Sequence, residues 1–472
     1  MIILGTNSIK DTGYDVANSC RFNDGSSDGL RLSSLGTATN NKKQTLSFWC
    51  KRSTIGSVQR LFVTNGLSDP YFQIFFQSND KLRWQTYEGS VGSVSNFITT
   101  RVFRDNLSWY HFHLVYDTTQ STSTDRTSLY INGVKETAYD TEVYPSLNST
   151  TEFDNTTLYI GEWGGGDSFF DGYLAEFVVL DGQSITPDGN TGEFDSDSGI
   201  WKPVDVSGLT FGTNGFYLDF EDSSALGNDV SGNNNDFTAN NLTAIDQSTD
   251  TCTNNWAVLN SLPKSGVTFA EGNLQADNQS SDWTSALATF GSSTGKYYAE
   301  FKVTDDAAGT TRNMFGICDA RDVQTMSEDE LGQNPSNRQG DTVGYSGNGT
   351  GNCLKNGSDQ GSGFNTTYGV NDIISVALDC DNSAVYIAKN GSWLNSGNPE
   401  SGASKTGAVT ITAGEIYLIG GTVYNSTYQA NFGNPIHSIS SGNADGDGYG
   451  NFEYAVPSGY YALNTKNLAQ YG

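Results

Sequence analysis

The sequence is poor in basic residues and in long apolar runs. Lys and Arg number 25 against 53 Asp and Glu, which gives a formal net charge of −28. A field of that sign repels phosphate backbones and anionic lipid, so we expect no nucleic-acid partner. No window approaches the roughly 18 consecutive apolar residues that a membrane span needs, so we expect no membrane insertion.

Cysteine and histidine are also scarce, with 6 and 3 residues. None of the cysteines forms a CxxC pair, which argues against a zinc site. Cys50 and Cys318 each end an apolar run and are predicted to be small buried residues. His111 and His113 share one face of a predicted strand, but no third ligand lies nearby, which favours a structural role over metal binding.

Secretory features are lacking at the start of the chain. The stretch "MIILGTNSIKDTGYD" turns polar after four apolar residues, with neither a basic leader nor a cleavage site. We therefore expect no signal peptide.

Glycine and aromatic residues are plentiful instead. There are 54 Gly, and 12% of the 472 residues are aromatic. Glycine, Asn, Ser and Thr disfavour long helices, whereas many short strands joined by polar turns suit this composition. The length exceeds what one core organises. The predicted fold class is all-β, with two antiparallel, jelly-roll-like β-sandwich domains joined by an irregular ordered segment.

The order of the strand-like runs sets the expected domain boundaries. Runs such as "TLSFWCKR" and "WYHFHLVYD" fill the first half, and "KYYAEFKV" and "IISVALDCD" belong to the second. Between them lies a stretch rich in Asn, Asp, Gly and Ser. It is either a flexible linker or an ordered segment, and its apolar runs "GFYLDF" and "NNWAVLN" favour order. We expect an arm over 1–15, a sandwich over 16–205, a connector over 206–265 and a second sandwich over 266–472.

One hairpin device occurs in both halves. "SLYINGVKE" and "AVYIAKNGSW" each place Asn-Gly between two strand-like runs, at Asn132-Gly133 and Asn390-Gly391. Both residues of the pair tolerate the positive φ of a type I′ turn. Each half is therefore predicted to contain an antiparallel meander, which indicates fold rather than function.

These pieces resemble two known families. "TLSFWCKRS", "WYHFHLVYD", "SLYINGVKE", "LYIGEW" and "FFDGYLAEFVVLDG" are similar in order to laminin-G-like domains of the concanavalin-A-like lectin/glucanase superfamily. "GKYYAEFKV", "MFGICD", "VGYSGNG", "NDIISVALDCDNSAVYIAKNGSW" and "NFEYAVPSGYYAL" resemble a SPRY domain.

The connector carries a third resemblance. "GFYLDFEDSSALGNDVSGNNNDFTANNLT" is similar to a segment between such domains in virion proteins of marine tailed phages. The resemblance implies a protein of the virion, assembled in the host cytoplasm, with other virion proteins as partners. It also implies a homo-oligomer, a trimer by analogy with phage fibres, and marks the apolar start Met1–Leu4 as a candidate anchor to the particle.

Catalysis is not expected, although concanavalin-A-like folds also include glycoside hydrolases. Such enzymes need two carboxylates on one strand face. The family pattern Glu-x-Asp-x-x-Glu is approached only at Glu193, Asp195 and Asp197, in a turn-rich segment without apolar residues in between. A solvated loop is the better interpretation.

Two loops are candidate glycan-binding surfaces, because saccharides are bound by aromatic faces beside carboxylates and amides. In "GEWGGGDSFFDGY" the candidates are Trp163, Asp167, Phe169 and Phe170; the alternative is that the rings close the end of the sandwich. In the polar loop over 345–369 they are Tyr345 and Asn348; the alternative is a mobile tip.

Calcium is the one cofactor with any sequence support. Asp445 and Asp447 alternate in a glycine-rich turn that lacks the Glu of an EF-hand loop. Laminin-G-like domains often hold calcium at the rim, so the resemblance implies Asp117 and Asp171 as further weak candidates.

The leading hypothesis is a non-enzymatic structural or adhesion protein of a tailed-phage particle. It would be a tail fibre or receptor-binding component that presents loops to a host surface glycan or to neighbouring subunits. A capsid decoration or head fibre protein is the first alternative. A secreted bacterial glycan-binding adhesin and a glycan hydrolase are the others.

Overall fold

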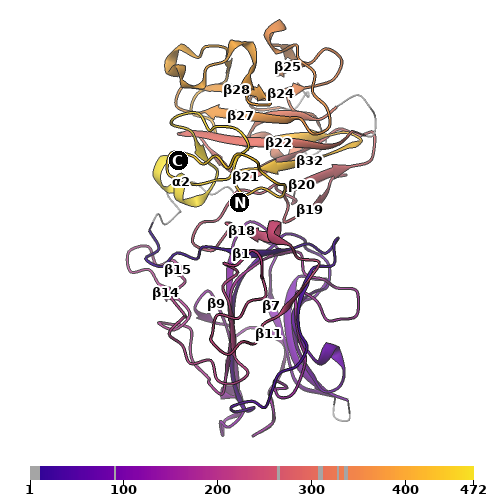
Figure 1. Cartoon of the computed structure of the whole chain (residues 1–472), viewed down its shortest axis with the longest axis vertical. Coiled ribbons are helices and arrows are strands. Elements are labelled where there is room, and N and C mark those ends of the chain that lie inside the picture. Colours follow the sequence, from indigo (N-terminus) through magenta and orange to yellow (C-terminus); the bar gives the residue numbers. More distant parts are fainter. Residues whose placement is uncertain (1–10, 90–91, 263–265, 307–311, 327–328, 334–337) are drawn as a thin grey trace. The chain divides into compact units, whose positions relative to one another are not determined.

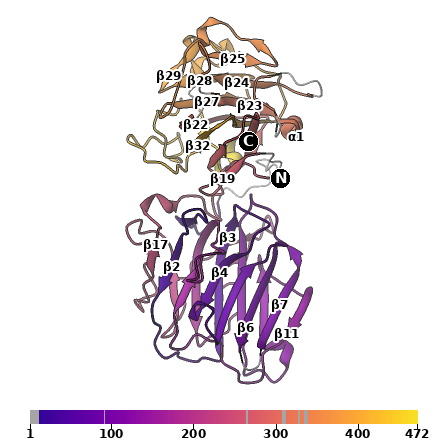
Figure 2. The same ribbon diagram turned by 90° about the vertical axis from the view of Figure 1, so that its right-hand side faces the viewer.

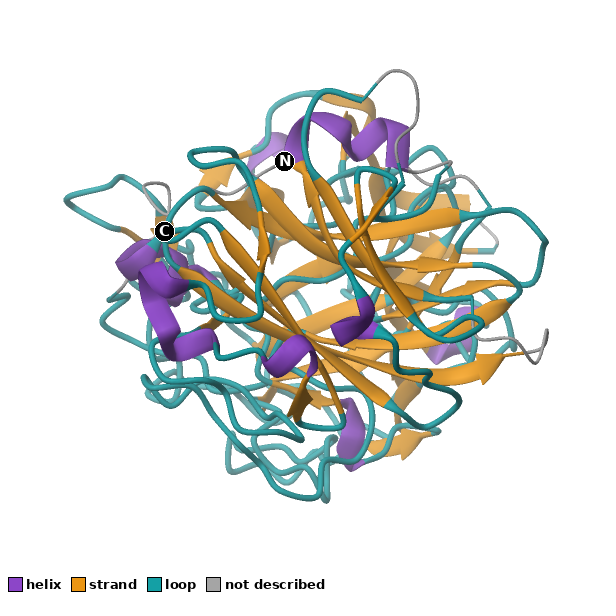
Figure 3. Ribbon diagram, turned by 90° about the horizontal axis from the view of Figure 1, so that it is seen from above, coloured by secondary structure: helices purple, strands orange, loops and turns teal. Residues whose placement is uncertain are grey.

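The structure is a computed structural model that describes residues 11–89, 92–262, 266–306, 312–326, 329–333 and 338–472. The candidate anchor Met1–Leu4 lies outside these ranges. Contacts divide the chain into two compact units, one over Thr12–Asn254 and one built on Asn255–Gly472. Strands dominate both units and helices are short (Figures 1 and 3). Within the described ranges no helix is long and apolar enough to cross a bilayer.

The first unit contains two sheets of eight strands. The back sheet has the order β10 (Val134–Lys135), β9 (Thr127–Ile131), β8 (Tyr110–Asp117), β3 (Lys43–Arg52), β13 (Gly172–Asp181), β1 (Ser19–Phe22) and β18 (Gln247–Ser248), with β16 (Phe216–Leu218) also paired to β13. The front sheet has the order β11 (Tyr139–Val143), β7 (Gly92–Val102), β6 (Lys81–Glu88), β5 (Tyr71–Phe76), β4 (Gln59–Thr64), β12 (Leu158–Ile160), β2 (Gly29–Leu32) and β17 (Thr238–Asn240) (Figure 2).

Alternating aromatic side chains fill the space between these sheets. Because successive strand residues point to opposite faces, Phe72, Ile74 and Phe76 of β5 all reach the core. Phe48 of the back sheet stacks on Phe177 with ring centroids 5.0 Å apart. The pairing is antiparallel throughout both sheets, so the predicted antiparallel sandwich is confirmed for this unit.

The segment expected to be a connector joins the first unit over most of its length. β16, β17 and β18 extend the two sheets. Asp250 lies against the back sheet, where its Oδ2 is 2.7 Å from Lys51 Nζ and its Oδ1 accepts a 3.0 Å hydrogen bond from Trp109 Nε1. The short ribbon of β14 (Glu193–Phe194) and β15 (Trp201–Lys202) brings Trp201 onto the same outer face of that sheet.

The second unit also consists of two sheets. The large sheet has the order β19 (Thr268–Ala270), β20 (Gln275–Asn278), β32 (Ser426–Asn431), β22 (Lys296–Asp306), β27 (Ile373–Asp379), β28 (Ala384–Lys389) and β29 (Ser392–Trp393), with β30 (Val409–Thr410) on β28 and β33 (Tyr461–Ala462) parallel to β22. The small sheet has the order β21 (Thr284–Ser292), β31 (Tyr417–Val423), β23 (Met314–Asp319), β24 (Thr342–Ser346), β25 (Asn352–Lys355) and β26 (Ser358–Asp359). The helices are α1 (Val323–Met326) and α2 (Thr465–Tyr471).

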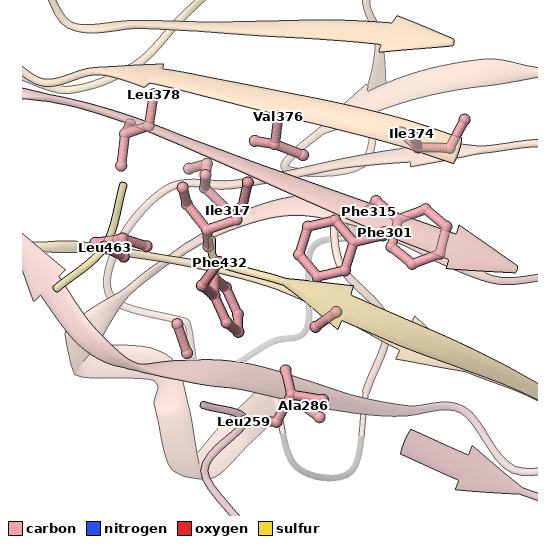
Figure 4. Close-up of a cluster of buried hydrophobic side chains, with 14 of the residues drawn as sticks. Leu259, Ala286, Phe301, Phe315, Ile317, Ile374, Val376, Leu378, Phe432 and Leu463 are labelled. Atoms are coloured by element: carbon pink, nitrogen blue, oxygen red, sulfur yellow. The ribbon is translucent and has the colours of Figure 1, made fainter. Parts of the chain in front are cut away.

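The core of the second unit lies between its two sheets (Figure 4). Phe301 of β22 stacks on Phe315 of β23 at 5.0 Å and meets Phe432 edge-on at 6.0 Å. Ala257, Val258 and Leu259 of "NNWAVLN" belong here, and Leu259 forms a bridge to Ala288; Trp256 of the same run is buried in a separate cluster with Tyr298 and Phe452. The predicted connector is thus divided between the units, with residues before 255 in the first and those after it in the second.

Both predicted Asn-Gly hairpins are present. φ is +49° at Asn132 and +75° at Gly133, and +47° at Asn390 and +75° at Gly391. The turns join β9 to β10 and β28 to β29. Positive φ at both positions is the type I′ geometry that matches the twist of paired strands.

Candidate functional site

A cavity of about 450 Å³ opens on the small sheet of the second unit. Trp283, which precedes β21, Met314 at the start of β23 and Leu354 in β25 supply its apolar lining, and the other lining residues are polar or glycine. These side chains belong to an apolar cluster separate from the main core, on the outer face of the sheet. The volume falls in the range of sites for small ligands.

One wall of the cavity is the segment that follows α1. Glu330 and Gln333 line it. Leu331 N donates to Thr422 Oγ1 at 3.0 Å, which fixes this segment on the sheet. Burial and the neighbouring Asp329 raise the pKa of the Glu330 carboxyl, whereas a hydrogen bond with Gln333 lowers it.

The opposite rim is the turn between β24 and β25. Gly351 closes it with a hydrogen bond to Asn348 O at 3.0 Å. A Cβ at Gly351 would stand 2.1 Å from Thr366 O, and φ there is +77°, so the turn requires glycine. This close approach holds Asn348 and Asn365 beside the opening.

The side-chain amides at the opening are free to bind a ligand. Asn348 and Asn365 are exposed, and Asn352 is partly exposed. No hydrogen bond from these three side-chain amides occurs within the described part of the chain. Each can donate and accept, which is the chemistry that fixes the hydroxyls of a saccharide.

Trp283 gives the cavity an aromatic surface with fixed orientation. Its ring lies 4.6 Å from that of Tyr424, tilted by 42°. The Arg312 guanidinium lies over the Tyr424 ring, 4.7 Å from its centre. A ring held in this way can pack against the apolar face of a bound molecule at little entropic cost.

Of the two residues predicted in this half, one lines the cavity and one does not. Asn348 stands on the rim. Tyr345 is fully buried, its hydroxyl donating to Thr366 O and its ring packed on Tyr368 at 5.3 Å. Tyr345 thus supports the rim from beneath and exposes no ring to a ligand.

Of the four residues predicted to bind a glycan in the loop of the first unit, two are accessible at the surface and two are buried. Trp163 Nε1 donates to Asp167 Oδ1 and O, both at 2.9 Å, so these two residues form a small exposed motif. Phe169 is 9% exposed and Phe170 is fully buried, 6.0 Å from the Phe22 ring. The two phenyl rings close the end of the sandwich, and only Trp163 and Asp167 are available at the surface.

Two calcium candidates, Asp117 and Asp171, belong to the first unit, and the other two share one turn of the second, where Asp447 N donates to Asp445 Oδ1 at 3.0 Å. Within the described ranges no three His, Cys, Asp or Glu side chains gather as a metal site would require. Asp171 is 1% exposed and accepts a hydrogen bond from Thr54 Oγ1 at 2.5 Å. Asp447 is exposed and accepts from the Tyr471 hydroxyl at 3.0 Å.

The carboxylates of the other two candidates, Asp117 and Asp445, are engaged by hydrogen bonds within the protein. Burial opposes ionisation of Asp117, but hydrogen bonds from Thr119 and Gln120 and the Lys43 ammonium lower its pKa to about 2. Asp445 accepts four hydrogen bonds: from Asp447 N, Tyr449 N, Ala462 N and Asn467 Nδ2, at 2.8–3.0 Å. A carboxylate bound in this way ties α2 to the glycine-rich turn.

The acidic triplet considered for catalysis is a surface turn. Lys202 Nζ lies 3.3 Å from Glu193 and 3.5 Å from Asp195. Asp195 Oδ1 also caps the turn by accepting from Ser198 N at 2.8 Å. The predicted interpretation of a solvated loop agrees with this geometry.

The histidine pair is part of the packing. His111 Nδ1 accepts from Trp201 Nε1 at 3.0 Å, and its Nε2 lies 2.8 Å from Ser47 Oγ. His113 lies 2.9 Å from both Thr191 Oγ1 and Ile185 O. Burial lowers the pKa of both, to about 4 for His113. The two rings are neutral hydrogen-bonding elements beneath residues 185–201.

Sequence reasoning missed Trp283 and the wall segment. Trp283 is isolated in the polar stretch "NQSSDWTSA", and a lone large aromatic among polar residues was the available signal. Glu330 and Gln333 offered none, because their position depends on how residues 329–333 cross the sheet.

One family model of known proteins matches part of the first unit. Residues 24–188, within the first unit, match the laminin G family described as the concanavalin A-like lectin/glucanases superfamily. No curated protein sequence matches the chain.

Among solved structures, the human HERC1 SPRY domain is 14% identical, with a TM-score of 0.28 over 36% of this chain and 96% of that one. A putative carbohydrate-binding protein from Bacteroides ovatus is 18% identical, with a TM-score of 0.33 over 48% of this chain and 59% of that one. Domains LG4-5 of the mouse laminin alpha1 chain are 11% identical, with a TM-score of 0.30 over 95% and 98%.

Proposed function

We propose that the protein is a non-enzymatic, glycan-binding adhesion protein and that a saccharide binds in the cavity beside Trp283. The observation that carries the proposal is the composition of that cavity: one oriented indole beside apolar side chains, with unengaged amides of Asn348, Asn352 and Asn365 at the opening. An aromatic face with a few convergent polar groups is the usual makeup of a saccharide site.

A glycan array probed with the full chain tests the proposal. The best neutral glycan is then titrated by calorimetry against the wild type and the variant with Asn348→Ala and Asn365→Ala. Two lost hydrogen bonds at about 1 kcal/mol each weaken binding by about tenfold or more. Gln470→Ala removes an exposed amide of α2, outside the cavity, and should leave affinity unchanged. If all three proteins bind the glycan with equal affinity, the cavity is not the saccharide site.

The absence of catalysis is the second part of the proposal. Glu193 and Asp195 are engaged by Lys202 on a surface turn, and Glu330 has a raised pKa in the cavity wall. A second carboxyl, Asp359, lines the same cavity, but it is exposed and accepts a hydrogen bond from Gly361 N at 2.9 Å. We therefore propose that Asp359 caps a turn and does not act with Glu330 as the carboxylate pair of a glycosidase. Mixed polysaccharides incubated with the chain should release no new reducing ends; release abolished by Glu330→Gln would show that the protein is an enzyme.

We further propose that the protein is part of a tailed-phage particle, as a tail fibre or receptor-binding component. The resemblance of residues 215–243 to a segment of phage virion proteins supports this placement. A capsid decoration and a secreted bacterial adhesin are the alternatives. Antibody labelling of purified particles in cryo-electron microscopy distinguishes a place on the tail from a place on the capsid. Particles that lack the protein would contradict both placements. Sedimentation of the purified chain tests the trimer expected by analogy.

A further inference from the structure

Two arginines lie on the outer face of the front sheet, in the first unit, whereas the proposed saccharide cavity belongs to the second. Arg60 of β4 and Arg83 of β6 stand opposite Phe75 of β5, so the three residues form one row across neighbouring strands. Their guanidinium carbons lie 4.4 Å and 5.8 Å from the Phe75 ring centre. The two cations are thus held over one ring.

Neither arginine has a carboxylate partner in the described part of the chain. Five other arginines of the same unit form ion pairs: Arg21–Asp246, Arg31–Glu162, Arg52–Asp80, Arg101–Glu136 and Arg104–Asp80. Arg126 donates instead to the main-chain carbonyls of Gln120, Ser121 and Pro145. The carboxylate that acts electrostatically on the Arg60 guanidinium is Asp167, and this carboxylate already accepts a hydrogen bond from Trp163 Nε1. Two neighbouring guanidinium groups without a carboxylate partner favour the binding of an anionic group from a ligand.

Amides form the next row along the same face. Gln73 of β5 stands opposite Gln85 of β6, and Gln85 stands opposite Asn96 of β7. Arg60 Nη1 donates to Gln73 Oε1, and Arg83 Nε donates to Asn96 Oδ1 at 2.9 Å. Arg60 Nε and Gln85 Oε1 are buried with no hydrogen-bond partner in the described ranges. Such unmet polar atoms are costly unless a ligand or water satisfies them.

An aromatic pair ends the face. Tyr71 and Tyr87 are partly exposed, and their rings stack with centroids 5.2 Å apart. Gln85 Nε2 donates to the Tyr71 hydroxyl at 3.2 Å. Because a strand advances about 3.3 Å per residue, roughly 13 Å separate the tyrosine row from the arginine row.

We infer that this face, defined by Arg60, Arg83, Gln85, Tyr71 and Tyr87, binds an acidic oligosaccharide. A uronate carboxylate would lie between the two guanidiniums, the amides would hydrogen-bond sugar hydroxyls, and a neighbouring pyranose ring would pack on the tyrosines. Guanidinium presents donors in the fork geometry that fits a carboxylate. The site is separate from the neutral-glycan cavity and does not depend on it.

Calorimetry with the full chain and oligogalacturonate tests this site, with the fully methyl-esterified oligomer as the neutral probe. The double variant Arg60→Gln with Arg83→Gln should bind oligogalacturonate about tenfold or more weakly than the wild type. Lys135→Gln, on exposed β10 of the other sheet, makes half the charge change and should bind as the wild type does. The ester should bind weakly to every variant, and wild-type affinity should fall with salt.

Arg83→Gln alone serves if the double variant does not fold, as judged by circular dichroism. Equal binding of acid and ester, or unchanged binding by the arginine variants, overturns the inference. So does the absence of binding to oligogalacturonate, oligoguluronate and hyaluronan oligosaccharides alike. If the arginine variants instead dissociate an oligomer of the chain, the face is a subunit contact and the ligand assignment is wrong. The variant with Asn348→Ala and Asn365→Ala should retain acidic binding, which separates this result from failure of the cavity proposal.

Discussion

Removing the Asp250 carboxylate should destabilise the first unit strongly. Lys51 Nζ and Asp250 Oδ2 are 2.7 Å apart, and their side chains are 1% and 0% exposed. Breaking a buried pair from one side leaves a charge in a medium that solvates it poorly, at a cost of about 3–5 kcal/mol. Asp250→Ala also deprives Trp109 Nε1 of its acceptor at 3.0 Å. We therefore expect a loss in the upper part of that range.

Urea unfolding followed by tryptophan fluorescence measures the effect. With a slope of about 2–3 kcal/mol/M, the first unit's midpoint should fall by about 1–2 M. Hydrogen exchange should quicken in the paired strands β1 and β18, because the Asp250 side chain fixes the main chain directly after β18, where the carbonyl of Asp250 accepts a 2.6 Å hydrogen bond from Ser19 Oγ. The control is Asp140→Ala, which breaks an exposed pair with Lys81 and should leave the midpoint unchanged.

The double variant Lys51→Met with Asp250→Leu tests the physical cause. It removes both buried charges, so it should recover much of the stability that Asp250→Ala loses. If Asp250→Ala unfolds at the wild-type midpoint, residues 206–254 are not an integral part of the first unit and the account of the connector fails.

Two further predictions concern single carboxyl groups. Burial raises the pKa of Glu176 to about 8, so between about pH 4.5 and pH 8 the folded chain binds one more proton than the unfolded chain. Glu176 alone should then lower stability by about 1.4 kcal/mol per pH unit across that window, while His111 and His113, whose pKa values burial lowers, act in the opposite sense below about pH 6.5. In pH-dependent denaturation the free energy of unfolding of Glu176→Gln should therefore rise relative to that of the wild type by this amount per pH unit; a pH-independent difference between the two proteins contradicts this. Asp445→Asn turns an acceptor of Ala462 N into a donor, and should cost about 2–3 kcal/mol. Because all four hydrogen bonds of Asp445 are internal, calcium or chelator should leave the melting temperature of the wild type unchanged; a calcium-dependent rise lost in Asp445→Asn would make Asp445 a calcium ligand.

The fold could be predicted because its signals are local. Asn132-Gly133 and Asn390-Gly391 specify type I′ turns through the conformations of two residues. Alternation within a run, as in β5, specifies which side chains reach the core. The place of the connector was less accessible, because Asp250 acts through Lys51, some 200 positions earlier. The composition of such a segment shows that it is polar, but it does not show which sheet the segment covers.

The candidate site was predicted only in part, because exposure depends on neighbours distant in sequence. Tyr345 was expected in a polar loop, but it belongs to β24, and Tyr368 and Thr366 fold back over it. Phe170 adjoins exposed glycines, yet it enters the core beside Phe22. Asn348 is exposed because Gly351 turns the chain away immediately after it. Residue type identified possible ligand-binding chemistry, and tertiary packing decided which of those residues remain accessible.

Burial explains the strongest shifts of acids and bases in the first unit. It shifts the pKa values of Glu176, His111 and His113, and each ring or carboxyl is engaged by protein partners. In the second unit Glu330 has a raised pKa and lines the open cavity, which is where enzymes place shifted acids. The reducing-end assay with Glu330→Gln therefore decides between the proposed binding role and catalysis. Asn348 at the same opening can hold a hydroxyl in place and moves no proton at neutral pH, which is the chemistry that the proposed binding site uses.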